Sequence, residues 1–140
     1  MTIRQCTQSD IALLARMNKH LIEDERAPNA MDIAQLQQRM TQFILGSYCA
    51  YFFMVDNAPI GYALCDSART PMYLRQFFIE RAHRRRGYGK VAFQLLLAHL
   101  GVEQIDIDVY AWNAGGIAFW QTLGFSTRYH SMRYEKSQPI

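Results

Sequence analysis

Residues 73–101, YLRQFFIERAHRRRGYGKVAFQLLLAHLG, decide the fold of this 140-residue chain. The stretch opens on a run from Tyr73 to Ile79 that predicts a strand and closes on leucines at helical spacing that stop at Gly101. Between the two lies a loop, Arg84-Arg85-Arg86-Gly87-Tyr88-Gly89. Apolar and polar residues alternate over 105–109, which predicts a further strand. A strand-loop-helix-strand unit needs a crossover, so its two strands should lie parallel and open onto one ligand crevice.

The rest of the chain predicts a sheet and helices around this unit. Strands are expected at Ile3–Cys6, Tyr48–Val55, Ile60–Cys65 and Arg128–Tyr134, and helices beginning near Ile11, Asp32, Gly87 and Gly115. No repeat or linker interrupts this order. We therefore expect one α/β (α+β) domain over residues 1–140, with a mixed, mostly antiparallel sheet and about four helices.

Positive charge is concentrated at the loop. The chain has 15 lysines and arginines against 12 acidic residues, a formal net charge of +3. Residues 80–90 alone carry +4, so the remainder of the chain sums to −1. A nucleic-acid-binding protein spreads its basic residues over a face or stripe. The distribution therefore favours one small anionic ligand, and no nucleic-acid partner is expected.

Composition also argues against several other classes. The longest apolar runs are too short to span a bilayer, and no basic segment followed by an apolar core begins the chain, so a cytoplasmic protein with no membrane partner is expected. The three cysteines, Cys6, Cys49 and Cys65, are odd in number and far apart, which favours buried thiols over disulfides. The four histidines show no paired ligand spacing, so no metal site is expected.

The loop has the physical features of an anion site. Its two glycines let backbone N–H groups approach a ligand closely, and the first-turn N–H groups of the following helix have no partner within the helix. The helix dipole and the arginines add attraction at the same place, which suits a pyrophosphate. The loop is neither a Walker A motif nor a Rossmann fingerprint. A solvated basic loop is the alternative.

The loop resembles the Arg/Gln-x-x-Gly-x-Gly/Ala motif with which the GNAT superfamily of N-acetyltransferases binds acetyl-coenzyme A (acetyl-CoA). Asn113 and the segment Ala118–Phe125 are similar to the family's downstream Asn and Ala-aromatic-x-x-x-Gly-Phe, in the same order and spacing. The order of elements is similar over nearly the whole chain. The resemblance implies a GNAT-like domain with one central parallel strand pair splayed at the cofactor site. It also implies transfer of an acetyl group from acetyl-CoA to a primary amine by direct attack.

The resemblance further implies which residues bind the cofactor. Backbone groups at the end of the 73–79 strand would pair with the pantetheine arm and polarise the thioester carbonyl. The expected cofactor residues are Phe77, Phe78, Ile79, Arg84, Arg85, Arg86, Gly87, Tyr88, Gly89, Lys90, Asn113 and Trp120. Core packing is an additional role for the Phe77–Ile79 side chains, and a helix N-cap is the alternative for Asn113.

Two residues, Asp108 and Tyr73, are expected in the catalytic site. Deprotonating a lysine-like amine of pKa about 10.4 at pH 7 costs about 4.6 kcal/mol, so a base matters. Asp108, on the polar face of the expected 105–109 strand, stands where similar ribosomal-protein acetyltransferases carry a carboxylate base; it would act through a water, with Asp106 in reserve. A surface carboxylate is the alternative. Tyr73 stands where histone-type members place a glutamate, and a neutral tyrosine suits substrate positioning better than proton removal.

Two features leave the function open. Trp120 stands where many members have a tyrosine that protonates the departing thiolate, and an indole cannot deliver a proton, so packing against coenzyme A is its expected role. A noncatalytic coenzyme A-binding sensor or interaction module is the alternative function. The acidic cluster Glu23–Glu25, at a helix C-terminus that its charge opposes, favours a cationic acceptor; a surface cluster is the alternative. The acceptor and a homodimer both stay open.

Overall fold

The structure of the chain is a computed structural model that describes residues 1–137. It divides into two compact units, Met1–Tyr110 and the residues from Ala111 onward, which are described separately. The last three residues of the predicted 1–140 domain lie outside the described part.

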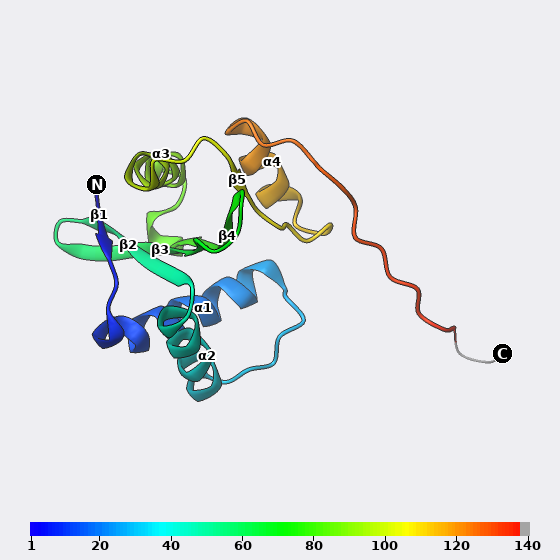
Figure 1. Ribbon diagram of the computed structural model, residues 1–140, viewed down its shortest axis with the longest axis horizontal. Coiled ribbons are helices and arrows are strands. Elements are labelled where there is room, and N and C mark those ends of the chain that lie inside the picture. The colour runs from blue at the N-terminus through cyan, green and yellow to red at the C-terminus, as the bar shows by residue number, and fades with distance from the viewer. Residues whose placement is uncertain (138–140) are drawn as a thin grey trace. The chain divides into compact units, whose positions relative to one another are not determined.

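The first unit holds a sheet and three of the four α-helices found in residues 1–137 (Figure 1). Its strands are β1 (Thr2–Gln5), β2 (Tyr48–Val55), β3 (Ala58–Asp66), β4 (Met72–Ile79) and β5 (Ile105–Asp106). Its helices are α1 (Ile11–Glu25), α2 (Ile33–Leu45) and α3 (Tyr88–Leu100), with short 3-10 helices at η1 (Gln8–Asp10) and η2 (Arg81–His83). The second unit contains α4 (Ala114–Thr122). The prediction of about four helices is confirmed.

The sheet has the order β1-β2-β3-β4-β5. The first three pairs are antiparallel and β4 pairs with β5 in parallel, so the mixed, mostly antiparallel sheet with one parallel pair is confirmed. This pair lies at one edge of the described sheet. The prediction of a closing strand over Arg128–Tyr134 was wrong, because these residues pair with no strand in the described part of the chain. β-favouring residues alone do not make a strand; Met132 and Tyr134 are 91% and 87% exposed.

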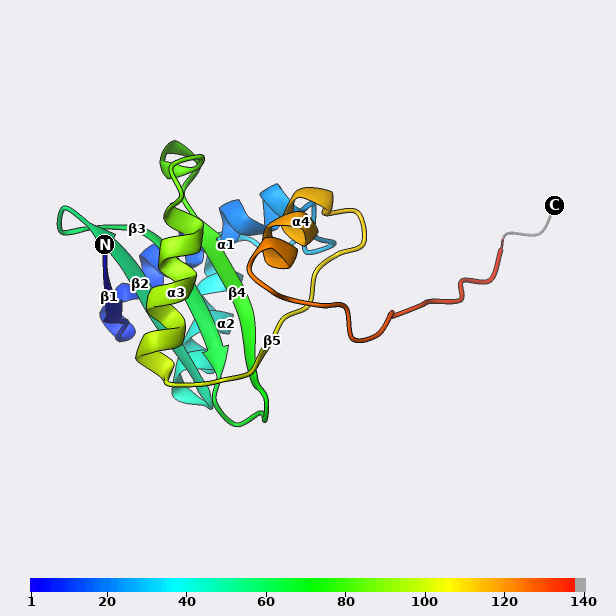
Figure 2. The ribbon, with the colours of Figure 1, turned by 90° about the horizontal axis from the view of Figure 1, so that it is seen from above.

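Helices cover both faces of the sheet. Figure 2, with Figure 1, shows α1 and α2 against one face and α3 against the other. The larger core cluster lies between the sheet and α1/α2, and its fully buried members include Leu14, Phe52, Tyr62 and Leu64. Full burial of each such side chain contributes about 1.5–3 kcal/mol. On the opposite face the rings of Phe77 and Phe93 meet edge to face, which seats α3.

A β-bulge divides β4 into two halves. Leu64 of β3 lies opposite Gln76, and the next residue, Cys65, lies opposite Leu74, so Arg75 is an extra residue in β4. Residues directly opposite in an antiparallel pair share a face of the sheet. The bulge therefore brings Tyr73, which lies opposite Asp66, onto the same α1/α2 face as Gln76. Regular alternation would have put Tyr73 on the α3 face.

Candidate functional site

Strand β4 extends past the end of its parallel neighbour. The β4–β5 pairing consists of Met72 with Ile105 and Tyr73 with Asp106, and Figure 2 shows β5 beside the start of β4 only. Within the described residues no strand pairs with the rest of β4 on that side. The strand expected over 105–109 is thus only two residues long. The placement of Asp108 on its polar face was wrong, because the chain leaves β4 before reaching it.

The second half of β4 turns alternate backbone groups toward the side on which β5 has ended. The N–H of Glu80 donates to the carbonyl of Ile60 on β3 at 2.7 Å. Since successive residues of a strand direct their N–H and C=O groups to opposite sides, the backbone groups of Phe77 and Ile79 point away from β3. This is the arrangement that the resemblance implies for the pantetheine arm. The cofactor role of Phe77, Phe78 and Ile79 stays a prediction.

The loop after β4 adopts a conformation that suits close approach of a ligand. Arg85 and Gly87 both have left-handed backbone angles, with φ of +62° and +74°. A Cβ at Gly87 would meet no atom within 4 Å, so the loop is open there. The first backbone bond of α3 runs from Val91 N–H to Gly87 C=O, so the amides of residues 88–90 precede the helical ladder. An anion could accept hydrogen bonds from these amides.

The basic residues of the loop fall into two groups. Arg84 is engaged with protein groups: its Nε donates to the carbonyl of Ile79 at 2.7 Å, and its Nη2 pairs with the carboxylate of Asp24. Arg85, Arg86 and Lys90 form no ion pair with the described residues, and all three are exposed. Arg85, Arg86 and Lys90 are therefore available to bind an anion, whereas Arg84 is occupied by Ile79 and Asp24 in this conformation.

The structure brings the two predicted catalytic residues together. The Tyr73 hydroxyl donates to Asp108 Oδ2 at 2.7 Å, across 35 positions of sequence. Burial, followed by the hydrogen bond to Asp108, raises the pKa of Tyr73 well above its ordinary value, so the phenol keeps its proton. The guanidinium of Arg69 stands 4.0 Å from the centroid of the Tyr73 ring. Tyr73 is 8% exposed, whereas Asp108 is exposed and accessible to a substrate.

A buried polar network on the same face was missed by sequence reasoning. The Tyr62 hydroxyl donates to Gln76 Oε1 at 2.7 Å, and Arg39 Nη2 donates to Asn18 Oδ1 at 3.0 Å. Asn18 and Gln76 are 1% and 8% exposed. Polar residues at core positions of a predicted helix and strand were the available signal, because buried amides need partners.

The predicted cofactor residues of the second unit have structural duties. The Asn113 side chain accepts a hydrogen bond from the Gly116 N–H at 3.0 Å. Asn113 therefore caps α4, which is the alternative role that the sequence predicted for it. A Cβ on Gly116 would stand 2.4 Å from the Asn113 amide nitrogen. The Trp120 ring contacts Phe119 and Phe125, with centroids 4.9 and 5.2 Å away. Coenzyme A contacts of Asn113 and Trp120 stay predictions.

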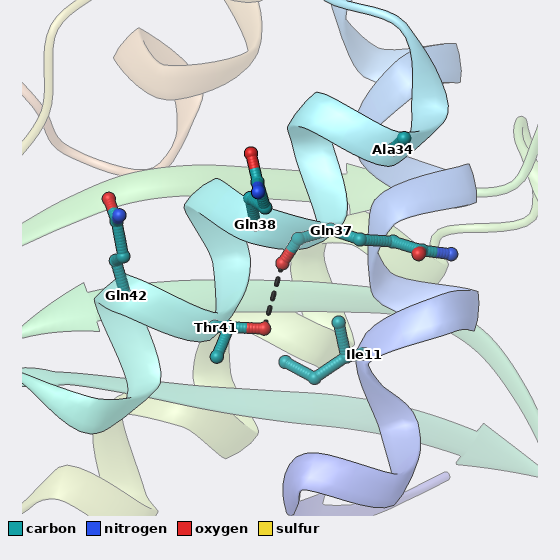
Figure 3. Close-up of a pocket in the computed structure, with 6 residues that line it drawn as sticks. All are labelled: Ile11, Ala34, Gln37, Gln38, Thr41 and Gln42. Atoms are coloured by element: carbon teal, nitrogen blue, oxygen red, sulfur yellow. Dashed lines mark hydrogen bonds between the residues drawn. The ribbon is translucent and has the colours of Figure 1, made fainter.

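A surface hollow lies elsewhere, on the outer side of α2 (Figure 3). Its lining residues are Ile11, Ala34, Gln37, Gln38, Thr41 and Gln42. The Thr41 hydroxyl donates to the Gln37 carbonyl within this surface at 2.8 Å. None of its side chains titrates near neutral pH. It therefore offers no acid or base, and it contains none of the predicted site residues.

Two of the three cysteines are buried thiols. Burial raises the pKa of the Cys6 and Cys65 thiols to about 12, so both stay protonated. The described residues contain no group of three or more His, Cys, Asp or Glu side chains placed to hold a metal ion. No α-helix in that part of the chain is long and apolar enough to cross a membrane.

Comparison with known proteins places the fold. Residues 14–125 match the model of the acetyltransferase (GNAT) family. Among solved structures, the BH1408 protein of Bacillus halodurans (a tetramutant) has a TM-score of 0.79 at 19% identity, with 97% of this chain and 100% of that chain covered. An aminoglycoside 6′-N-acetyltransferase, AAC(6′)-IG of Acinetobacter haemolyticus, has a TM-score of 0.74 at 15% identity, with 99% and 100% covered.

A third structure contains a ligand. AAC(6′)-Iy, in complex with the bisubstrate analogue CoA-S-monomethyl-acetylneamine, has a TM-score of 0.69 at 22% identity and 97% of each chain covered. No curated protein matches the chain. The structural likenesses share the fold, while the family match extends from α1 to Phe125 and includes β4, the loop and α4. On this match, the chain belongs to the GNAT acetyltransferase family.

Proposed function

We propose that this chain is an N-acetyltransferase that moves the acetyl group of acetyl-CoA to a primary amine by direct attack of the amine on the thioester. The observation that carries the proposal is the arrangement along β4, which extends beyond β5, has the Tyr73–Asp108 pair where β5 lies beside it and leads at its other end into the glycine loop. Family membership supports acetyl transfer, and the AAC(6′)-Iy complex, with an analogue that joins coenzyme A to an acetylated amine, supports nitrogen as the acceptor atom.

The residues present fit acetyl-CoA. Bound there, this cosubstrate supplies an activated acetyl thioester. Its pyrophosphate would accept from the amides of residues 88–90 and pair with Arg85, Arg86 and Lys90, because the loop is open at Gly87. Its pantetheine arm would lie along the second half of β4, beyond the end of β5, on the side that faces away from β3.

The side chains at the first half of β4 would serve the acceptor. An amine must lose a proton before it attacks, and Asp108 would take that proton through a bridging water. Tyr73 stays protonated and donates to Asp108, so it would hold the carboxylate in place. A thiol of pKa near 8.5 leaves readily as thiolate, so a tryptophan at position 120 is compatible with turnover.

The test is acetyl-CoA binding followed by turnover on a panel of amines. Ligand at about 100 times its Kd should stabilise the protein by about 2.7 kcal/mol, visible as a rise in Tm. Thiol release is then measured with neamine, a polyamine, free amino acids and peptides bearing an α-amine or a lysine. Stabilisation with release supports the proposal. Stabilisation with no release from any amine favours the noncatalytic coenzyme A-binding module, and no stabilisation at saturating ligand overturns both.

A further inference from the structure

We propose that Asp24, at the C-terminal end of α1, is a positioning residue that sets the cofactor loop for the pyrophosphate of acetyl-CoA by clamping Arg81 and Arg84. The inference rests on the proposed function and deepens it, because it assigns the control of cofactor affinity to a carboxylate remote from the glycine loop in sequence. It also replaces the expectation that this acid faces a cationic acceptor.

The clamp joins the Asp24 carboxylate to the guanidinium groups of Arg81 and Arg84. One carboxylate oxygen of Asp24 accepts from Arg81 Nε at 2.8 Å, and the other accepts from Arg84 Nη2. Arg84 Nε donates in turn to the Ile79 carbonyl, the last residue of β4, at 2.7 Å. The Asp24 side chain thus joins the end of α1 to Arg81 and Arg84. Through Arg84 it is also linked to Ile79, the last residue of β4. The Arg84 guanidinium also stacks 5.4 Å from the centroid of the Phe78 ring.

The partial burial of Asp24 and its two arginine partners distinguish this carboxylate from one in a simple surface ion pair. The Asp24 side chain is 17% exposed, and that of Arg84 is 39% exposed. Burial opposes the negative charge of Asp24, but the hydrogen bonds and charges of Arg84 and Arg81 outweigh it and lower the pKa of Asp24. A partly desolvated carboxylate with two guanidinium partners is stronger than an exposed pair, which contributes little.

The clamp lies next to a strained part of the loop. Arg85 follows Arg84 directly and has a φ of +62°, a left-handed conformation that costs a non-glycine residue energy and persists only where its surroundings enforce it. Fixing Arg84 on both Asp24 and Ile79 supplies that enforcement. The same contacts occupy Arg84, so the clamp also leaves Arg85, Arg86 and Lys90 as the phosphate-binding cations.

The experiment compares Asp24→Asn with a matched control at the other end of the same helix. Asp10 precedes α1 and accepts two hydrogen bonds from Arg4, at 3.1 and 3.2 Å, so Asp10→Asn breaks an equivalent aspartate–arginine pair away from the loop. We expect Asp24→Asn to raise the Kd and KM of acetyl-CoA about 10-fold with kcat nearly unchanged, and Asp10→Asn to change neither. Asp24→Glu should recover part of the affinity.

A second donor separates positioning of the loop from general loss of structure. Acetyl-pantetheine lacks the pyrophosphate, so its kcat/KM should be the same for Asp24→Asn and the wild type. A double-mutant cycle with Arg84→Gln should show that the double variant loses no more acetyl-CoA affinity than the worse single variant, since both substitutions open one clamp. Arg81→Gln, on the more exposed partner, repeats the test if Asp24→Asn folds poorly.

Three results would overturn the inference. They are an unchanged Kd for acetyl-CoA in Asp24→Asn, an equal loss with both donors, and a raised KM confined to the amine. The last result would make Asp24 an acceptor residue. Failure of the wild-type protein to bind acetyl-CoA would instead overturn the proposed function, so the two failures are distinguishable.

Discussion

The two halves of β4 belong to one strand, but they present different groups to the proposed site. The first half, Met72 and Tyr73, pairs with β5 and presents a side chain, the Tyr73 hydroxyl, to Asp108. The second half, ending at Ile79, extends past β5 and presents backbone groups and a loop. The bulge at Arg75 separates them. In the first half, function should therefore depend on side-chain identity, and in the second half on backbone conformation and the charges around it.

The largest effect should come from the loop at the end of the second half. Gly87→Glu adds a negative charge and a side chain in the space where the pyrophosphate would lie, so acetyl-CoA affinity should fall at least about 100-fold, measured by calorimetry. Gly101→Glu is the matched control, because Gly101 ends α3 with a φ of +64° and is equally open. It should lose comparable stability and keep its acetyl-CoA affinity. Equal affinities in the two variants would contradict this placement of the pyrophosphate.

The next effect concerns the side chain beside the first half. Asp108→Asn removes the proposed base, and kcat/KM should fall about 100-fold for a lysine-like amine with acetyl-CoA affinity preserved. The loss should be smaller for an α-amine of pKa near 8, which is already partly neutral at pH 7. Asp106→Asn, made in parallel, tests the reserve base. A full loss in Asp106→Asn with normal activity in Asp108→Asn would assign the base to Asp106, two residues earlier.

A smaller effect is expected at Tyr73. Tyr73→Phe keeps the packing and removes the hydrogen bond to Asp108, which should cost about 3- to 10-fold in kcat with little change in acetyl-CoA affinity.

The same variant has a defined pH signature. The raised pKa of Tyr73 stabilises the fold fully below its ordinary value of 10.0, and this contribution is lost as the pH rises above 10, where the unfolded chain releases the proton and the folded chain does not. The Tm advantage of the wild type over Tyr73→Phe should therefore shrink above pH 10. An advantage that stays constant to pH 11 would contradict burial of this phenol.

The smallest effect concerns the stability that the Asp24 clamp, next to the second half of β4, contributes at acid pH. Because the pKa of Asp24 is lowered from 3.8, the stability contributed by its clamp is complete above that value and is lost as the pH falls through the lower, folded-state value. The difference in Tm between the wild type and Asp24→Asn should accordingly narrow as the pH falls below 3.8. A difference that widens on acidification would show that the carboxylate is not held by the two arginines.

The accuracy of the predictions from sequence differed between the two halves of β4 and their surroundings. The strand, the loop and the start of α3 were predicted from short patterns: a run rich in aromatic and aliphatic residues, two glycines and leucines at helical spacing. The extent of β5 and the strand over Arg128–Tyr134 were predicted wrongly, because alternation indicates that a segment could be a strand and not that a partner lies beside it. Tyr73 and Asp108 were each identified, but their contact was not.

Taken alone, the sequence determined the order of elements, the glycine loop between β4 and α3, and the concentration of positive charge there, since periodicity, backbone freedom and net charge are properties of neighbouring residues. The tertiary structure decided the rest. The bulge at Arg75 chose the face of Tyr73, and packing brought Tyr73 to Asp108 across 35 positions and Asp24 to Arg84 across 60. Contacts at such separations depend on strand register and helix packing, which are set only when the whole first unit folds.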